Sequence, residues 1–371
     1  MVPNLRFSSF ADPFRIYTLK EVLQRISFPV TVDENKLYYQ IGIRSHSKGI
    51  FYKEAEIGKQ IGNKRIFWIE PNCLILNIVF AWEQAVAKTS EKEVGMVASH
   101  RFPMYKVLNN SLDYIVDFFK TEKGKQLLQM ASPGGAGRNK TLNQDFFLNS
   151  KIYLPSLNEQ LKTTELIELI EDRIETQIKI INDYKLLKRY ITKSFIKQKG
   201  TSYLLSEIAE LGRGRVISSA EISKQKNPIY PVYSSQTSNN GVMGYLDNYD
   251  YEGEYITWTT DGANAGTVYY RNGKFNCTNV CGILKIKNGY DAYYISNILN
   301  CYTKKYVSTN LANPKLMNNV MANIKINLPS IERQKYFSNI LKAIEYRIKI
   351  EQDIKLNLVK QKVFLLKNMF L

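Results

Sequence analysis

The sequence contains a long internal repeat. Residues 154–160 read LPSLNEQ, and 174 residues later residues 328–334 read LPSIERQ. An internal repeat restricts the possible folds, because each copy must form the same structural unit. A period of this length does not fit a solenoid, so we expect two copies of one large unit. The same offset relates Ile170, Glu171, Arg173, Ile174 and Ile180 to Ile344, Glu345, Arg347, Ile348 and Ile354.

The repeated part has the pattern of a long helix. After each Leu-Pro-Ser, apolar residues recur every three or four positions with charged residues between them, which is typical of a coiled coil. Pro155 and Pro329 suit the start of a helix, and Ser156 and Ser330 are good N-caps. We therefore predict helices within 154–199 and 328–371. About 40 residues at ~1.5 Å per residue make a rod of roughly 60 Å.

Opposite charges on the two predicted helices suggest how they pair. Residues 154–175 carry a net charge of −4, and residues 354–371 carry +4. Flanking charges of opposite sign select the partner and orientation of coiled-coil helices. We therefore expect an antiparallel pair. The alternative is that each helix packs separately on its own domain.

The overall charge indicates a polyanionic partner. The chain has 51 Lys and Arg against 34 Asp and Glu, a net charge of +17 spread along its length. Such a balance favours nucleic acid as the partner, although a soluble basic protein is the simpler alternative. An apolar content of 44% is enough to build cores. We find no apolar run of membrane-spanning length and no secretory signal. The four cysteines fit a reducing compartment, so we expect a cytoplasmic protein.

Two globular parts precede the predicted helices. Within 1–153 and 200–327, short Tyr, Val and Ile runs alternate with turn-forming clusters, which predicts small mixed sheets with long loops. Each part should close with a helix, over 110–130 and 291–306. The predicted fold class is α+β, with two mixed α/β domains separated by two long antiparallel coiled-coil helices in a pseudo-two-fold repeat.

The sequence does not predict a catalytic site. Asn227-Pro-Ile-Tyr230 resembles the Asn-Pro-Pro-Tyr motif of amino-methylating enzymes, but no Gly-rich cofactor loop accompanies it. We interpret it as a turn that enters a strand. Cys277 and Cys281 could form a ligand pair, but with only two histidines in the chain buried free thiols are the better interpretation. We predict a non-enzymatic chain that uses no cofactor and no metal.

Together these features resemble the specificity subunits of Type I restriction-modification systems. Val2-Pro-Asn-Leu-Arg-Phe7 is similar to the usual opening of that family. The two Leu-Pro-Ser segments are similar to the phrase that ends each target recognition domain and begins each conserved helix. Gly262-Ala-Asn-Ala-Gly-Thr-Val268 and Ser99-His-Arg-Phe-Pro103 look like segments of two recognition-domain types.

The resemblance implies a division of labour along the chain. Residues 1–153 and 200–327 would each be a target recognition domain for one half of a split double-stranded DNA target. The helices within 154–199 and 328–371 would space them and bind two methyltransferase subunits. A translocating restriction subunit would join for cleavage. The alternatives are a stand-alone nucleic-acid-binding scaffold, a coiled-coil assembly protein, or a complete nuclease or methylase, which the missing motifs oppose.

Base reading needs polar side chains on loops. Gly-rich and Asn-rich loops at 132–140 and 308–315 could also approach phosphates, or could be simple crossovers between elements. The candidate DNA-binding residues are Arg44, His46, Lys48, Lys64, Arg65, His100, Arg101, Arg138 and Lys140 in the first domain, and Arg213, Arg215, Lys224, Ser234, Ser235, Gln236, Thr259, Asp261, Asn310 and Lys315 in the second.

Overall fold

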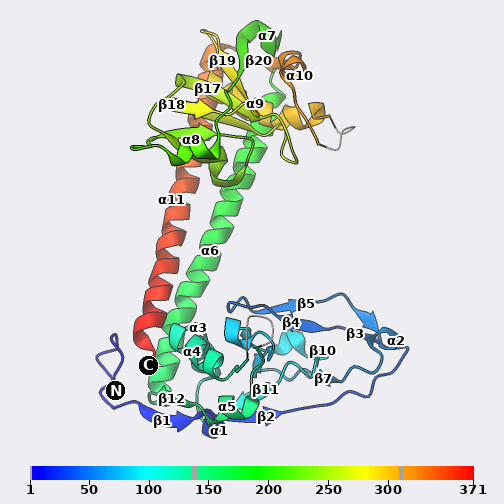
Figure 1. The fold of residues 1–371 in the computed structure, drawn as a ribbon, viewed down its shortest axis with the longest axis vertical. Coiled ribbons are helices and arrows are strands. Elements are labelled where there is room, and N and C mark those ends of the chain that lie inside the picture. The colour runs from blue at the N-terminus through cyan, green and yellow to red at the C-terminus, as the bar shows by residue number, and fades with distance from the viewer. Residues whose placement is uncertain (1, 135–139, 309–312) are drawn as a thin grey trace. The chain divides into compact units, whose positions relative to one another are not determined.

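A computed structural model describes residues 2–134, 140–308 and 313–371. The chain divides into two compact units, Met1–Gln177 with Ile354–Leu371 (unit 1) and Ile178–Asp353 (unit 2). Two long helices, α6 (Leu157–Ile196) and α11 (Ile331–Met369), each contribute to both units (Figure 1). Within the described residues, every helix is too short or too polar to cross a bilayer.

Unit 1 contains several small sheets. Its largest sheet has four antiparallel strands in the order β2-β11-β8-β9. Four two-stranded sheets pair β1 with β12, β10 with β7, β3 with β6, and β4 with β5. The strands are β1 Arg15–Thr18, β2 Leu23–Ile26, β3 Leu37–Tyr38, β4 Ile41–Ile43, β5 Ile50–Tyr52, β6 Glu56–Ile57, β7 Ile66–Trp68, β8 Leu74–Leu76, β9 Val86–Lys88, β10 Val97–Ser99, β11 Met104–Val107 and β12 Lys151–Leu154.

One helix predicted for unit 1 is divided into two in the structure. The predicted helix over 110–130 is two helices, α3 (Leu112–Lys120) and α4 (Glu122–Met130). Thr121 ends α3 in an extended conformation, and its hydroxyl accepts a hydrogen bond from the Gly124 amide at 3.1 Å, which starts α4. A side chain at Gly124 would meet the Phe118 carbonyl, so the two helices pack closely there. The shorter helices are α1 Leu19–Val22, α2 Gly58–Ile61 and α5 Gln144–Asn149.

Unit 2 is built on one larger sheet. Six strands lie in the order β14-β19-β17-β18-β15-β16, with β15 and β18 parallel and the other pairs antiparallel. A separate pair joins β13 to β20. The elements are β13 Thr201–Leu204, α7 Leu205–Ile208, β14 Ala209–Arg213, α8 Ser219–Ser223, β15 Tyr230–Tyr233, β16 Val242–Leu246, β17 Tyr251–Thr259, β18 Val268–Cys277, β19 Cys281–Ile286, α9 Ala292–Tyr302, α10 Asn318–Ala322 and β20 Lys325–Leu328.

The two units share an arrangement where the long helices begin, which consists of a short strand pair, a one-turn helix and a buried glutamine. We call this arrangement the frame. In unit 1, β1 pairs with β12 so that Arg15 lies opposite Leu154. In unit 2, β13 pairs with β20 so that Thr201 lies opposite Leu328. Each first strand continues into a one-turn helix, α1 or α7. In both cases a Glu three residues into that turn accepts a 2.6 Å hydrogen bond from the amide of the preceding cap residue.

A buried glutamine from each repeat completes this frame. The Gln160 side chain accepts a hydrogen bond from the Ser111 amide at 2.9 Å and donates to the Pro155 carbonyl at 3.0 Å. Gln334 accepts from the Asp291 amide at 3.0 Å and donates to the Pro329 carbonyl at 2.8 Å. Ser111 and Asp291 are the N-caps of α3 and α9. Each glutamine therefore fixes the closing helix of its globular part to the start of a long helix.

A second sequence match belongs to this frame, and our sequence analysis missed it. Tyr17-Thr-Leu-Lys-Glu21 and Tyr203-Leu-Leu-Ser-Glu207 share Tyr, Leu and Glu at the same spacing. Leu19 and Leu205 are fully buried in the cores of their units. The match lies at a different offset from the repeat of the long helices, because the globular parts differ in length.

The long helices pack in opposite directions within each unit. In unit 2, Phe195 of α6 stacks on Phe337 of α11 with ring centroids 3.6 Å apart, and Lys188 pairs with Glu345. In unit 1, Glu171 of α6 pairs with Lys362 of α11 at 2.5 Å. The acidic start of α6 and the basic end of α11 thus meet in unit 1, as their charges predict.

Candidate nucleic-acid interface

Unit 2 has an open polar cleft formed by three loops. The loop after β15 contributes Ser234, Ser235 and Gln236, and the loop between β17 and β18 contributes Asp261 and Gly262. The turn between β18 and β19 closes the third side. The cleft measures about 430 Å³. Four of the predicted residues therefore come together, although the sequence brings them from two separate segments. Asn264, Thr278 and Asn279 also line the cleft and were not among the predicted residues.

A buried arginine supports the Gln236 loop. Arg271 lies on β18, is 4% exposed, and stacks on the Tyr233 ring at 3.5 Å from its centroid. Its guanidinium donates hydrogen bonds to the Asn240 carbonyl at 2.9 Å and to the Thr257 hydroxyl at 3.1 Å. Burial lowers the pKa of Arg271, since the charge is partly removed from water. Arg271 therefore shapes the loop that presents Gln236.

Three predicted residues hold the loops around this cleft. Thr259 is 1% exposed, and its hydroxyl binds the Asn264 carbonyl. Asp261 and Lys315 form an isolated β-bridge, and their side chains lie 3.6 Å apart. Asp261 also accepts a hydrogen bond from the Thr260 hydroxyl at 2.6 Å. Thr259 stays inside the protein, whereas Asp261 and Lys315 remain partly exposed at the cleft.

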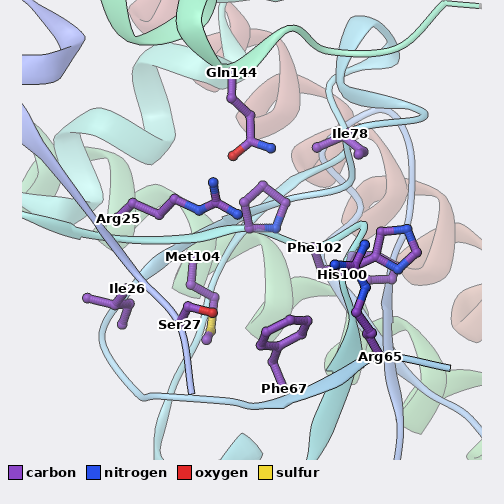
Figure 2. Close-up of a pocket in the computed structure, with 11 residues that line it drawn as sticks. Arg25, Ile26, Ser27, Arg65, Phe67, Ile78, His100, Phe102, Met104 and Gln144 are labelled. Carbon is purple, nitrogen blue, oxygen red and sulfur yellow. The ribbon is translucent and has the colours of Figure 1, made fainter. Parts of the chain in front are cut away.

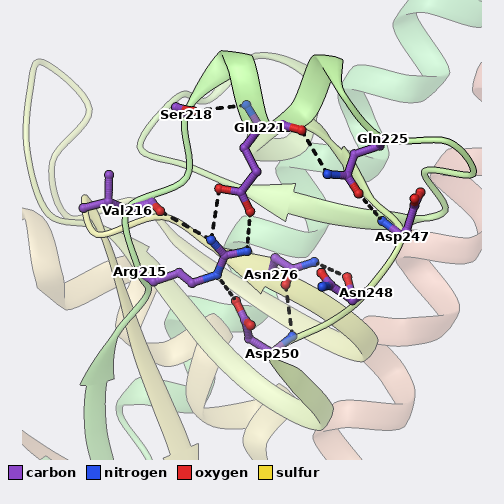
Figure 3. Close-up of polar contacts among 9 residues, drawn as sticks. All are labelled: Arg215, Val216, Ser218, Glu221, Gln225, Asp247, Asn248, Asp250 and Asn276. Carbon is purple, nitrogen blue, oxygen red and sulfur yellow. Dashed lines mark hydrogen bonds and ion pairs between the residues drawn. The ribbon is translucent and has the colours of Figure 1, made fainter.

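Arg215 is held by carboxylates of its own unit. Its guanidinium donates to both Glu221 oxygens, at 2.7 and 3.1 Å, and to Asp250 at 3.1 Å (Figure 3). The hydrogen bond that Arg215 donates to Glu221 raises the pKa of Arg215. Arg215 thereby ties α8 to the loop before β17. Nearby, Lys224 is exposed at the end of α8, and Arg213 donates to the Asn318 side chain at 3.1 Å.

Unit 1 has a polar pocket of about 240 Å³ that gathers cationic side chains. Arg65 and His100 line one side, and Arg25 and Gln144 line the other (Figure 2). The His100 amide donates to the Arg65 carbonyl at 3.2 Å, which brings these two predicted residues together. Arg25 and Gln144 are additional members that sequence analysis missed. Arg25 lies in β2, where its outward position in a short strand carries no distinctive sequence signal.

The turn between β4 and β5 presents three more predicted residues. Arg44, His46 and Lys48 are all exposed. His46 has a φ of 60°, and its amide donates to the Glu83 carbonyl at 2.6 Å, so the backbone of this turn is anchored. Arg44 lies over the Phe51 ring at 5.2 Å. The turn is therefore an ordered, exposed cationic edge.

The remaining predicted residues of unit 1 are more scattered. Lys64 and Arg101 are exposed, and Lys140 lies over the Trp82 ring at 5.2 Å. Arg138, like Asn310 of the second predicted domain, lies outside the described residues. Exposed cations of this kind suit phosphate contacts, whereas the loops with Ser, Asn and Gln suit base edges.

The structure explains the two segments that resemble catalytic or metal-binding motifs, residues 227–230 and the pair Cys277 and Cys281. The Asn227 amide donates to Asp247 at 2.8 Å, and β15 begins at Tyr230, so this segment is the turn into a strand. Cys277 and Cys281 are free and buried. Among the described residues, His, Cys, Asp and Glu side chains form no group of three that could hold a metal ion.

Comparisons with known proteins agree with this arrangement. The family model described as the Type I restriction modification DNA specificity domain matches residues 200–361. A Mycoplasma pneumoniae protein, named as the N-terminus of a type I specificity subunit, is 44% identical over 142 residues, which are 38% of this chain and 75% of that protein. The chain belongs to the family of type I specificity subunits. The resemblance found in the sequence is therefore confirmed.

Two further comparisons cover more of the chain. Another Mycoplasma pneumoniae protein named as a type I specificity subunit is 37% identical over 199 residues, which are 52% of this chain and 82% of that protein. The crystal structure of a type I restriction-modification S subunit from M. genitalium has a TM-score of 0.63 at 14% identity. It covers 100% of this chain and 99% of its own. At that identity the structural likeness concerns the fold.

Proposed function

We propose that this specificity subunit reads a bipartite DNA target within a type I restriction-modification complex. Each globular part, 1–153 and 200–327, recognises one half-site, and the long helices space the two parts and bind methyltransferase subunits. The chain itself carries out no chemistry. It supplies base selection, and the complex supplies methylation and, where a restriction subunit joins, cleavage.

The main support for this proposal is that the two units share one frame but have different loops and sheets. Gln160 and Gln334 make equivalent hydrogen bonds to equivalent helix caps. The ion pairs Glu171–Lys362 and Lys188–Glu345 are also equivalent under the 174-residue repeat. The loops and sheets between these fixed points differ. A protein with two repeated frames and two unlike reading surfaces suits a target with two unlike halves.

The long helices offer matching surfaces for two copies of one partner. Tyr190 on α6 is 73% exposed, and Phe364, its equivalent on α11, is 58% exposed. Large exposed aromatic residues at equivalent positions are typical of protein contacts. We infer that each unit docks one methyltransferase subunit through this position, which gives two such subunits per chain.

Domain exchange tests the proposal directly. Residues 200–327 are replaced by the corresponding part of another specificity subunit, and the methylated sequence is determined genome-wide with and without the exchange. We expect one half of the methylated target to change and the other to stay the same. A change in both halves, or methylation without any defined target, would contradict independent reading.

Co-purification tests the docking surface. Tyr190→Ser and Phe364→Ser should each reduce the number of bound methyltransferase subunits from two to one, and the double variant should bind neither. Tyr346→Ser, at another exposed aromatic position of α11, is the matched control. Native mass spectrometry measures the stoichiometry. Unchanged stoichiometry in the double variant would place the partner elsewhere.

A pair of cysteines tests the antiparallel arrangement. Ile174→Cys and Leu358→Cys lie on α6 and α11 within unit 1, close in sequence to the Glu171–Lys362 ion pair. Spin labels at these sites should report a short distance. Labels that are consistently far apart in the folded chain would exclude the pairing.

A further inference from the structure

The second half of α6 carries a cationic groove that the proposed reading surfaces do not include. Lys185, Lys188, Arg189 and Lys193 line it from α6, and Asn300 and Cys301 line it from α9. The groove measures about 470 Å³ and lies wholly within unit 2. Lys185, Arg189 and Lys193 are exposed, while Lys188 is partly buried and pairs with Glu345. The groove therefore presents four cations against one carboxylate.

The equivalent position in unit 1 carries fewer cationic side chains. Lys185 and Arg189 correspond to Val359 and Val363 on α11, and only Lys188 and Lys193 have basic equivalents there. Counted from the N-caps of α3 and α9, Asn297 of the groove corresponds to Asp117 in unit 1.

Ion pairs close the unit 1 site. Lys120 lies 2.7 Å from Asp117 and 3.5 Å from Glu171, and Glu171 also pairs with Lys362. The shared frame therefore does not require a cationic groove. The positive charge in unit 2 is an addition to that frame.

Contacts within unit 2 connect the groove to the polar cleft. α9 leads into the short helix η5 (Thr303–Tyr306), where the Thr303 hydroxyl donates to the Gly266 carbonyl at 2.6 Å. Lys304 donates to the Ala265 carbonyl at 3.3 Å. The loop between β17 and β18, which contains Ala265 and Gly266, also reaches the cleft: the Asn264 side-chain amide donates to the Thr237 hydroxyl at 3.1 Å. Hydrogen bonds thus connect the loop at the cleft through η5 to α9, which lines the groove.

We propose that this groove binds the phosphate backbone of the spacer DNA next to the half-site read by unit 2. The inference rests on the proposed function and adds a non-specific phosphate surface to it. Lys185, Arg189 and Lys193 follow one another at four-residue steps, which cover about 12 Å along the helix. Phosphates of one strand are spaced about 3.4 Å along the duplex axis, so several can lie within this reach.

The position of the apolar residues favours DNA over a protein partner in the groove. Leu186 and Tyr190 are exposed and four residues apart, so they share a face of α6 that differs from the face of Lys185 and Arg189. A docked methyltransferase subunit would use the apolar face. The cationic face, with the Asn297 and Asn300 amide side chains beside it, suits phosphate oxygens.

A salt series separates phosphate binding from base reading. The double variant Lys185→Gln/Arg189→Gln is compared with wild type in the complex with the methyltransferase subunit, on cognate and scrambled duplexes. The slope of log affinity against log salt should fall by about two units. Between about 50 and 200 mM salt, wild type should therefore lose about tenfold more affinity than the variant. The ratio of cognate to scrambled binding should not change.

A matched variant controls for charge alone. Lys360→Gln/Lys367→Gln removes two exposed cations from α11 in unit 1 and should leave the slope as in wild type. An unchanged slope in the α6 variant, or an equal change in the control, would overturn the inference while leaving the proposed function intact. If wild type itself does not distinguish cognate from scrambled DNA, the proposed function fails instead.

Cys301 provides a direct probe of occupancy. It is exposed, whereas the other three cysteines of the chain are buried. Maleimide labelling of Cys301, followed by mass spectrometry of its peptide, should slow several-fold with a duplex that includes the spacer. A duplex that ends at the half-site should give no protection. Protection by the methyltransferase subunit without DNA would show that the groove is a protein interface and would overturn the inference.

Discussion

The two units share a frame and differ in what the frame carries. In both, a short strand pair, a one-turn helix and a buried glutamine connect the globular part to a long helix. Unit 1 then builds one four-stranded sheet and several strand pairs, whereas unit 2 builds a single six-stranded sheet. The cores differ accordingly. Unit 1 relies on Phe and Leu side chains of α3, α4 and α5, and unit 2 packs Trp258 and β-branched strand residues under α9.

This difference separates two kinds of constraint. The frame must pair with the long helices, so its residues satisfy buried hydrogen bonds and fill cores. The inserted sheets only need to carry loops at a surface, and loops tolerate variation. Under the proposed function, the loops can change what the chain reads while the frame stays the same.

The largest expected effects concern the matched core leucines of the frame. Leu154 and Leu328 are 1% and 2% exposed in their respective cores. Leu154→Ala and Leu328→Ala should each lower the free energy of unfolding of their unit by about 2–5 kcal/mol, because each leaves a cavity. Urea unfolding followed by Trp258 fluorescence, with Trp68 and Trp82 replaced by Phe, reports on unit 2, and Trp68 and Trp82 fluorescence, with Trp258 replaced by Phe, reports on unit 1. Very different costs for the two variants would mean that the frames are not energetically equivalent.

The buried glutamines should show a smaller effect that also distinguishes the units. Gln160→Leu and Gln334→Leu each leave a helix-cap amide without its partner, which costs about 1–3 kcal/mol per group. Gln160 also donates to Asn110 at 2.7 Å, so its loss should be the more costly. Hydrogen exchange at the Ser111 and Asp291 amides measures the local effect. Unchanged protection at both amides would show that the glutamines are not needed to hold the caps.

Substitutions in the polar cleft of unit 2 and in the Gly-rich loop of unit 1 should affect DNA binding differently. The first should lower sequence specificity, and the second should lower affinity for all sequences. Gln236→Ala in unit 2 should cost about 1–3 kcal/mol on the cognate duplex and little on a scrambled one. Lys140→Ala in unit 1 should weaken both duplexes alike and lower the salt slope by about one unit. Binding is measured over a salt series with the methyltransferase subunit present. Equal losses on both duplexes for Gln236→Ala would mean that its loop positions the protein and reads no base.

The smallest effect concerns the pH dependence of stability in unit 1. Burial raises the pKa of Asp117 above its ordinary value of 3.8, so the folded protein holds this proton more strongly than the unfolded chain. That contribution to stability is present at low pH and is lost as pH rises through the folded pKa. Asp117→Asn cannot lose a proton, so this variant should not show that loss of stability at higher pH.

Thermal unfolding measures this prediction from about pH 4 to 7. The melting temperature of Asp117→Asn relative to wild type should increase as the pH rises. Asn297→Asp places the same carboxyl at the equivalent position of unit 2, where Lys185, Lys188, Arg189 and Lys193 line the same groove. These cations favour the charged carboxylate, so this variant should gain stability relative to wild type as the pH rises. A constant difference between Asp117→Asn and wild type would show that Asp117 titrates normally.

The sequence by itself determined the two long helices and their pairing. Apolar spacing in α6 and α11, the Leu-Pro-Ser starts and the charges at their ends all depend on residues close together in the chain, so they can be read without a structure. The repeat also indicated two related units. The break of one predicted helix at Thr121 was missed, because a single capping hydroxyl decided it.

Only the tertiary structure decided which polar residues meet. Ser234 and Asp261 share a cleft because β15 and β17 belong to one sheet, which no local pattern reveals. Arg215 and Arg271 look alike in the sequence, but one is held by two carboxylates at the surface and the other is buried between aromatic rings. The cationic groove likewise needs α9 beside α6. Side-chain chemistry is local, but its neighbours are set by long-range packing, and function depends on the neighbours.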